Sequence, residues 1–410
     1  MYGKENFLKK QVKNIVPVLL GGDLNAYSVA LAFREAFGVL SHAFVRYRCG
    51  ATERSSFIKT HLCSELDDPR VAVPELLKFA YRHSGQDLYL IPCADWYVNM
   101  LERAKNVLSG IYKIHVPETD TWKKLSDKHT FYLALKDFGI PYPEYEVFMR
   151  GEKPSAKKLS RVEYPAVLKP SDSTEYWMHK FDGMEKVYFP KSSAEAAVTI
   201  CKIINSGYNG NIILQKKIGE GKDNRVLTTF SDEKGSVVRA VLGQVILEEI
   251  GKTSMGNHSA IITRPLDKIS FALIDFLNKQ KYKGIANIDI IADSSGVYAL
   301  ELNPRQGRSC DYLRAAGVNI AELLVKVGEK EAIQPKYDYR EVFWHYPSDR
   351  TVRRFAYEPL KFELETICDR GDNYSPYKNE YEKIRRKVYV FIHSMRLDGT
   401  FRKDAQRREK

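Results

Sequence analysis

The sequence predicts an α/β fold with α+β lobes, and three observations support this class. Short apolar runs alternate with amphipathic stretches in the first third of the chain, as in strands joined by helices. Further apolar runs, separated by polar turns, indicate antiparallel strand pairs in the middle. The length of 410 residues, with 44% hydrophobic and 28% charged residues, allows two or three domains.

The N-terminal region is predicted to form a small doubly wound domain. A strand at 14–20, a glycine turn at 21–25, a helix at 26–37 and a strand at 42–47 make a βαβ unit. A third strand is predicted at 87–92. The turn sequence GGDLN differs from GxGxxG, so we interpret its glycines as residues of a tight turn.

The middle of the chain begins with a helix that Ser126 or Asp127 caps and that runs to Phe138. The apolar strand PAVL then delivers Lys169 inward, which is unusual because a buried ammonium group needs an anion. Further elements are predicted in order: strands at 211–217, 225–230 and 236–242, and helices at 269–280 and 320–326.

Two strands at 286–292 and 297–302 are predicted to form a hairpin. The turn Asp-Ser-Ser-Gly between them favours a three-residue loop with a G1 bulge. That loop places Asp293 opposite Val297 and Ile291 opposite Ala299.

The same register places Asp289 opposite Glu301, with Asn303 on their face of the sheet. Two carboxylates facing each other repel, so the arrangement favours a hard cation between them, Mg²⁺ or Mn²⁺. The alternative is a solvated acidic face. The other face of the hairpin is expected to pack in the core: Ile288, Ile290, Leu300 and Leu302.

The motif NIDII…YALELNPR resembles the metal-binding strands of ATP-grasp carboxylate–amine ligases, and the resemblance extends through most of 12–330. Within that superfamily the sequence is most similar to the bacterial D-aspartate ligase branch. The resemblance implies an ATP-grasp fold with an N-terminal Rossmann-like pre-ATP-grasp domain. The expected parts are a pre-ATP-grasp domain at 1–118, a lid at 119–214, a catalytic subdomain at 215–336 and a C-terminal extension at 337–410.

The resemblance also implies the roles of individual residues. Arg305 and Arg239 are expected to orient carboxylate and acyl-phosphate oxygens, and Lys169 is expected to act in catalysis as well as in phosphate binding. Either Glu220 or Asp223 is expected to bind the ribose. The residues expected to bind ATP are Lys128, Lys169, Lys186, Gln215, Lys216, Lys217, Ile218, Glu220 and Asp223; those for the metal are Asp289, Glu301 and Asn303.

The reaction that the resemblance implies joins the β-carboxyl of D-aspartate to the lysine side chain of a UDP-linked peptidoglycan precursor through an acyl phosphate. The alternative is an ATP-grasp amino-acid or dipeptide ligase with another acid and acceptor. ATP and Mg²⁺ are the implied cofactors, and a homodimer is one possible assembly.

Charge, hydropathy and cysteine content argue against several other classes of protein. The net charge of +12 has no nucleic-acid-binding motif beside it, so we interpret it as attraction for anionic small substrates. No apolar run approaches the ~20 residues of a membrane span, and the polar start does not resemble a signal peptide. Six scattered cysteines without a CxxC motif fit reduced thiols in the cytoplasm. A long charged helix is predicted near 378–395.

Overall fold

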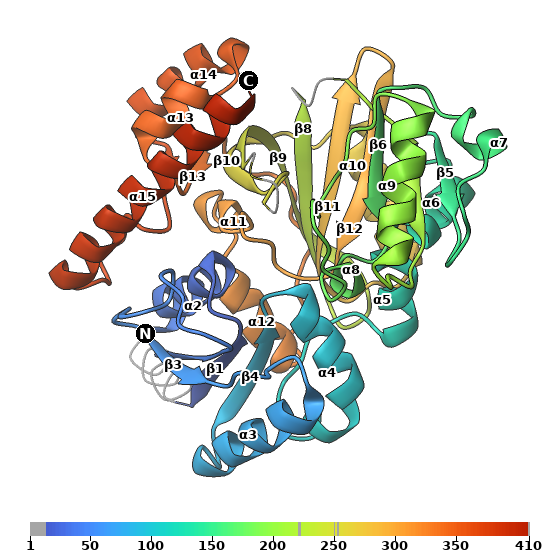
Figure 1. The fold of residues 1–410 in the computed structure, drawn as a ribbon. Helices are drawn as coiled ribbons and strands as arrows, with labels where there is room; N and C mark the ends of the chain where they lie inside the picture. Colours follow the sequence, from blue (N-terminus) through green and yellow to red (C-terminus); the bar gives the residue numbers. More distant parts are fainter. Residues whose placement is uncertain (1–13, 220–222, 250, 252–253, 409–410) are drawn as a thin grey trace.

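The computed structural model describes residues 14–219, 223–249, 251 and 254–408, and its strands form three sheets (Figure 1). The N-terminal sheet is parallel, in the order β3-β2-β1-β4. Strand β3 has no counterpart among the predicted strands, because its sequence IKTHL is polar and only partly buried. The elements of this region are β1 (Ile15–Leu20), α2 (Leu24–Phe37), β2 (Ser41–Val45), β3 (Ile58–Leu62), α3 (Pro69–Arg82), β4 (Asp87–Pro92) and α4 (Asp95–Leu108).

The turn between β1 and α2 is held by its glycines and by a helix cap. Gly21 has a φ of 127°, and a Cβ on Gly22 would lie 2.7 Å from Val45 Cγ1. Asp23 caps α2 by accepting hydrogen bonds from the backbone N–H groups of Asn25 and Ala26. The prediction of a tight turn is therefore confirmed.

A small antiparallel sheet in the order β5-β7-β6 forms the second layer, and α9 covers it (Figure 1). Its own core includes Phe148, Leu168, Tyr176 and Ile200. The elements are β5 (Tyr145–Phe148), α7 (Ala156–Leu159), β6 (Ala166–Pro170), α8 (Ser173–Tyr176), α9 (Ser193–Asn205) and β7 (Ile212–Lys216).

The central sheet runs in the order β12-β11-β8-β9-β10-β13-β14 and is antiparallel except between β13 and β14. Strand β9 continues six residues beyond its predicted end at Leu242, to Glu248. The elements of this part are α5 (Thr119–Ser126), α6 (Lys128–Asp137), β8 (Asn224–Ser231), β9 (Val237–Glu248), β10 (His258–Arg264), α10 (Lys268–Lys279), β11 (Gly284–Asp293), β12 (Gly296–Asn303), α11 (Tyr312–Ala315) and α12 (Ile320–Gly328).

The β11–β12 hairpin reaches its predicted pairing by a different route. Asp293 faces Gly296 and Ile290 faces Ala299, so the loop has two residues and the predicted three-residue loop is wrong. A bulge after Asp289 adds one residue to β12 and restores the pairing of Asp289 with Glu301. Leu300 is that extra residue, and it lines a cavity, so its predicted place in the core is also wrong.

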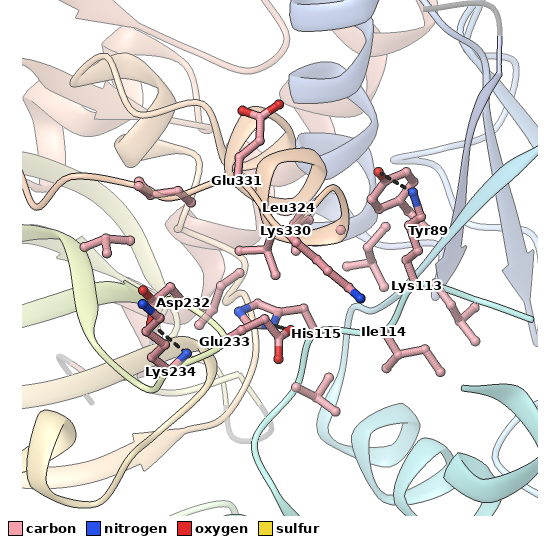
Figure 2. A pocket seen from close by; sticks show the side chains of 18 of the residues that line it. Tyr89, Lys113, Ile114, His115, Asp232, Glu233, Lys234, Leu324, Lys330 and Glu331 are labelled. Carbon is pink, nitrogen blue, oxygen red and sulfur yellow. Dashed lines mark hydrogen bonds and ion pairs between the residues drawn. The ribbon is translucent and has the colours of Figure 1, made fainter. Parts of the chain in front are cut away.

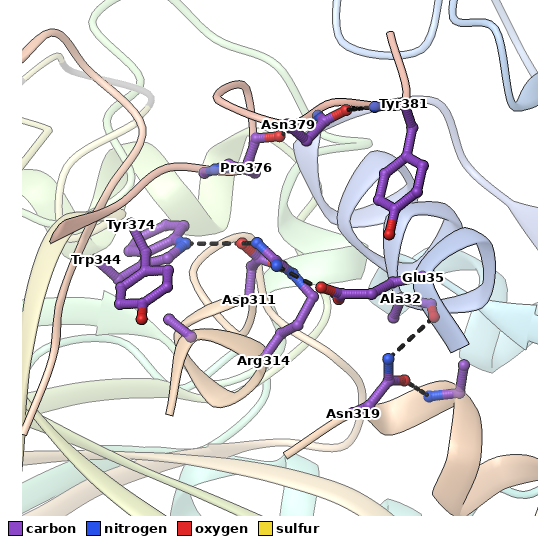
Figure 3. Close-up of polar contacts among 12 residues, drawn as sticks. Ala32, Glu35, Asp311, Arg314, Asn319, Trp344, Tyr374, Pro376, Asn379 and Tyr381 are labelled. Atoms are coloured by element: carbon purple, nitrogen blue, oxygen red, sulfur yellow. Dashed lines mark hydrogen bonds and ion pairs between the residues drawn. The ribbon is translucent and has the colours of Figure 1, made fainter. Parts of the chain in front are cut away.

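The C-terminal region adds two strands to the central sheet and then packs against the N-terminal region. Trp344 of β13 donates a hydrogen bond from Nε1 to Asp311 Oδ2 at 2.9 Å, and Asp311 also binds Arg314, which reaches Glu35 of α2 (Figure 3). The elements are β13 (Phe343–His345), α13 (Asp349–Phe355), α14 (Glu358–Asp369), β14 (Asn373–Tyr374) and α15 (Ile384–Arg408).

Helix α15 begins at Ile384, six residues later than predicted. The preceding residues are held by other contacts: Glu382 accepts hydrogen bonds from Ser55 Oγ and Ser56 N. All six cysteines are free thiols, as predicted. Among the helices that the structure describes, none is long and apolar enough to cross a bilayer. The prediction of an α/β fold is confirmed.

Candidate active site

A cavity of 650 Å³ lies between the small antiparallel sheet and the β11–β12 hairpin. Side chains from β6, β7, β8, β9, β11 and β12 line it, together with the start of α6. Several predicted site residues meet there although they are far apart in the sequence. They are Lys128, Lys169, Lys186, Gln215, Lys217, Ile218, Asp289 and Glu301.

Asp289 and Glu301 face each other across the floor of this cavity. Burial, and then the charge of Glu301, raises the pKa of Asp289 well above its usual range. Burial would also raise the pKa of Glu301, but Lys128 and Lys169 hold it well below its usual range. Asp289 Oδ1 is buried without a hydrogen-bond partner among the described residues. A buried carboxylate pair with an unsatisfied oxygen fits a hard divalent cation.

Asn303 follows Glu301 by two residues and therefore lies on the same face of β12. Its Oδ1 is 3.4 Å from Arg305 Nη2. Asn303 is not among the residues that line the 650 Å³ cavity.

Three lysines surround the carboxylate pair. Lys128 is the first residue of α6, and its Nζ lies 3.0 Å from Glu301 Oε2. Burial lowers the pKa of Lys169 to about 8, although the charge of Glu301 opposes the shift. Lys186 donates to the carbonyl oxygen of Met255 at 2.9 Å. Three lysines beside one ionised carboxylate leave positive charge for an anionic ligand such as a polyphosphate.

Apolar side chains also line the cavity, among them Val167, Ile218 and Leu300. Gln215 is buried there and accepts a hydrogen bond from the Tyr132 hydroxyl at 3.1 Å. Lys216 does not line the cavity. Its side chain points to the opposite face of β7 and lies 3.3 Å from Glu163, because successive residues of a strand alternate faces.

The two residues predicted to bind ribose have different positions. Both carboxylate oxygens of Asp223 accept hydrogen bonds from Arg225, at 2.7 and 2.6 Å, and Asp223 does not line the cavity. Glu220 lies outside the described residues.

Asn224 and Glu248 also line the cavity, although neither is among the predicted site residues. Asn224 donates to Glu248 Oε1 at 2.8 Å. Glu248 became part of the site because β9 extends past Leu242, a boundary that local patterning does not set. His258 lies opposite Glu248, and burial, then Lys186, lowers its pKa to about 4.

Arg305 lines a different and larger cavity, of 890 Å³, between the N-terminal region and the end of α12. Lys113, His115 and Lys330 also line this cavity (Figure 2). Arg305 Nη2 lies 2.9 Å from Asp95 Oδ2 at the start of α4. The arginine therefore connects the end of the hairpin to the N-terminal sheet region.

Arg239 lines neither cavity, and the structure does not bring it together with the other predicted site residues. Its guanidinium donates to the backbone carbonyls of Val238 and Gln334, both at 2.6 Å. Position 239 lies opposite Phe230, near the turn between β8 and β9 and away from the carboxylate pair.

Comparison with known proteins defines the class. Residues 125–309 match the family model described as ATP-grasp domain, a range that contains the residues lining the 650 Å³ cavity. This stretch matches an ATP-grasp domain, and the similarity of 85% of the chain to a ligase supports an ATP-dependent carboxylate–amine ligase. The N-terminal parallel sheet agrees with the expected Rossmann-like domain.

Two relatives show how far the similarity extends. The chain is 29% identical over 373 residues to D-aspartate ligase from Enterococcus faecium (strain Aus0004), covering 85% of this chain and 88% of that protein. It is 25% identical over 241 residues to the arginine-specific large chain of carbamoyl phosphate synthase from Geobacillus stearothermophilus, covering 55% of this chain but 21% of that one.

Solved structures share the fold at low sequence identity. An ADP complex of N5-carboxyaminoimidazole ribonucleotide synthetase has a TM-score of 0.60 at 15% identity, covering 87% of this chain and 86% of that one. L-amino acid ligase from Bacillus licheniformis has a TM-score of 0.55 at 14% identity, covering 78% of both chains.

Proposed function

We propose that this enzyme joins the β-carboxyl of D-aspartate to the lysine side chain of a UDP-linked peptidoglycan precursor and consumes ATP. The observation that carries the ATP-dependent chemistry is the Asp289–Glu301 pair beneath a cavity lined by lysines. The choice of substrates is supported by the similarity to D-aspartate ligase over 85% of the chain.

In this proposal the 650 Å³ cavity binds ATP. The phosphates lie beside Lys128, Lys169 and Lys186, whose charges offset those of the phosphate oxygens. The adenine lies near Ile218, with Gln215, Lys217 and the backbone of Lys216 beside it. Either Glu220 or Asp223 contacts the ribose; for Asp223 this requires exchange of its contact with Arg225.

Asp289, Glu301 and Asn303 would hold Mg²⁺ or Mn²⁺. The unsatisfied Asp289 Oδ1 and the repulsion within the pair are the features that suit this ion. Such an ion, when bound, supplies charge neutralisation for phosphate oxygens. The protein's contribution is to keep Glu301 ionised through Lys128 and to keep the floor of the site rigid on paired strands.

The reaction proceeds in two steps. A carboxylate oxygen of D-aspartate attacks the γ-phosphorus of ATP, and the bond between that phosphorus and the β,γ-bridging oxygen breaks. ADP departs, and D-aspartate becomes an acyl phosphate. The lysine amine of the acceptor then attacks the acyl carbon, loses a proton and expels phosphate. Arg305 orients the acyl group and stabilises the negative oxygen that develops, and Asp95 fixes its guanidinium at 2.9 Å.

We further propose that four segments of the chain have different roles. Residues 1–118 help to bind the amino acid, residues 119–214 form the lid over ATP, and residues 215–336 carry the metal hairpin. The N-terminal contribution is supported by the contact of Asp95 with Arg305. Residues 337–410 complete the central sheet through β13 and β14.

The test is coupled detection of ADP release with D-aspartate, L-aspartate and a lysine-containing UDP-linked precursor. We expect release that requires both D-aspartate and the precursor. Asp289→Asn should abolish release, because it removes one of the two floor carboxylates. Asp275→Asn is the matched control, since Asp275 is exposed on α10 and should leave the rate unchanged.

Release that L-amino acids stimulate and D-aspartate does not would instead identify an amino-acid or dipeptide ligase. In that case the acid and acceptor of the proposal would be wrong. The ATP site would still be judged by the effect of Asp289→Asn.

A further inference from the structure

Helix α15 carries a stripe of exposed apolar side chains that the ligase reaction does not use. Val388, Phe391 and Met395 are 54%, 63% and 54% exposed, and Ile384 and Ile392 extend the stripe. Spacings of three and four residues place these side chains on one face of a helix. We call this face, formed by Ile384, Val388, Phe391, Ile392 and Met395, the apolar stripe.

The apolar stripe is separate from the face that attaches α15 to the rest of the molecule. Arg386, Val390 and Phe401 lie on the opposite side of the helix and are buried. Arg386 donates to the carbonyl oxygen of Gly50 at 2.9 Å and also to that of Ala51. These contacts fix the helix, which lies along the edge of the molecule (Figure 1), while the side chains of its apolar stripe remain exposed.

Basic residues border the apolar stripe on both sides. At 100° per residue, Arg385 and Arg396 fall along one border and Lys387 along the other, and all three side chains are exposed. Lys403 continues the first border beyond the last stripe residue. Long basic side chains at such borders extend their charges toward phosphate groups while their stems cover apolar surface.

We propose that α15 binds an anionic lipid surface, with its axis in the plane of the surface and the apolar stripe inserted among the headgroups. An apolar face bordered by lysine and arginine is the pattern of helices that lie in a membrane interface. A second copy of the chain fits less well, because pairing two stripes would bring basic borders together. A phospholipid surface of negative charge complements those borders instead.

The test is co-sedimentation of the full chain with vesicles of phosphatidylglycerol and phosphatidylcholine, compared with vesicles of phosphatidylcholine alone. We expect binding to the anionic vesicles that high salt weakens, and little binding to the neutral ones. The double variant F391S/I392S should bind at least about tenfold more weakly, because it removes two apolar anchors. Both residues are exposed, so folding should be retained, and thermal unfolding checks this.

Two controls separate the stripe from general effects. Tyr81→Ser removes an aromatic that is 86% exposed on α3 and should leave vesicle binding unchanged. A triple variant, Arg385→Gln with Lys387→Gln and Arg396→Gln, should lose the preference for anionic vesicles. ADP release without vesicles should be the same in all variants, so failure of the ligase proposal would not affect this test.

Equal vesicle binding by the wild type and F391S/I392S would overturn the proposal. So would absence of wild-type binding to anionic vesicles. A wild-type dimer in sedimentation that F391S/I392S abolishes, without vesicle binding, would show that a second copy covers the stripe instead.

Discussion

Asp289 and Glu301 have opposite pKa shifts although they face each other on neighbouring strands. The asymmetry arises because Lys128 and Lys169 lie on the Glu301 side. The sequence predicted the opposed carboxylates from strand alternation and from the register of a three-residue turn, and the bulge preserves that pairing although the turn is shorter. It did not predict the asymmetry, because that depends on where a lysine from a distant helix is placed.

Lys169 gives a pH-dependent prediction. Burial lowers its pKa to about 8, so in the nucleotide-free enzyme it loses its proton as the pH rises above that value. We expect ATP affinity to fall above pH 8, by up to about tenfold per pH unit. Lys169→Arg should flatten this profile because arginine stays charged. The measurement is the dissociation constant of ATP from pH 7 to pH 10.

Lys217→Arg is the control for that profile, since Lys217 also lines the cavity but is exposed. It should keep the wild-type dependence. Parallel profiles for the wild type and Lys169→Arg would show that another group controls ATP affinity.

Asp289 gives a stability prediction for the metal-free protein. Its pKa is raised in the folded state by burial and by Glu301, so folding favours the protonated form. Stability should therefore fall as the pH rises from about 4, the unfolded value, through the folded pKa. Asp289→Asn should unfold at a temperature a few degrees higher than the wild type at pH 7 in a chelator. A lower unfolding temperature for Asp289→Asn would show that the ionised Asp289 carboxylate does not destabilise the folded protein.

At the scale of elements, most strands and helices followed from apolar spacing, and the errors have local causes. The hairpin turn closed with two residues, and a bulge at Leu300 compensated for the difference. The sequence of a turn does not reveal a bulge several residues away. A three-residue loop without a bulge and a two-residue loop with one both pair Asp289 with Glu301. Strand β9 extended to Glu248 because β10 pairs with it, which only tertiary contact determines.

Strand β13 gives a prediction at this scale. Trp344 is fully buried and donates to Asp311 at 2.9 Å. Trp344→Phe should cost about 1 kcal/mol of stability through the lost hydrogen bond. Trp344→Ala should cost about 3–5 kcal/mol, because it also leaves a cavity. Denaturant unfolding measures both.

Phe362→Ala provides the comparison, because this aromatic on α14 is 84% exposed and should change stability little. If Trp344→Ala were as stable as Phe362→Ala, β13 would not be part of the core of the central sheet.

At the scale of the molecule, a side chain of the N-terminal region binds a backbone carbonyl beside the hairpin. Asn25 donates from Nδ2 to the carbonyl oxygens of Cys93, at 2.7 Å, and of Gln306, next to Arg305. The sequence predicted the doubly wound sheet and the metal hairpin separately. Their contact was not predictable, because an asparagine in a glycine turn does not indicate which distant carbonyl it binds.

This contact predicts a selective defect. Asn25→Ala leaves the carbonyl of Gln306 without its donor and should loosen the Arg305 segment. We expect kcat/KM for the amino acid to fall about tenfold, while the KM for ATP changes little. Steady-state kinetics in each substrate measure the two effects.

Asn319→Ala is a matched control, because Asn319 donates to the carbonyl of Ala32 at 3.0 Å and also joins the N-terminal region to the rest of the chain (Figure 3). It lies away from Arg305 and should leave the kinetics of the amino acid unchanged. Equal defects in both variants would indicate general loosening of the N-terminal region.

The most direct test of the ATP site is calorimetric titration of ATP into the wild type and Asp289→Asn, with and without Mg²⁺. We predict that Mg²⁺ strengthens ATP binding to the wild type and that Asp289→Asn loses most of this gain, while Asp275→Asn keeps it. Equal Mg²⁺-dependent binding by the wild type and Asp289→Asn would contradict the placement of the nucleotide over the carboxylate pair.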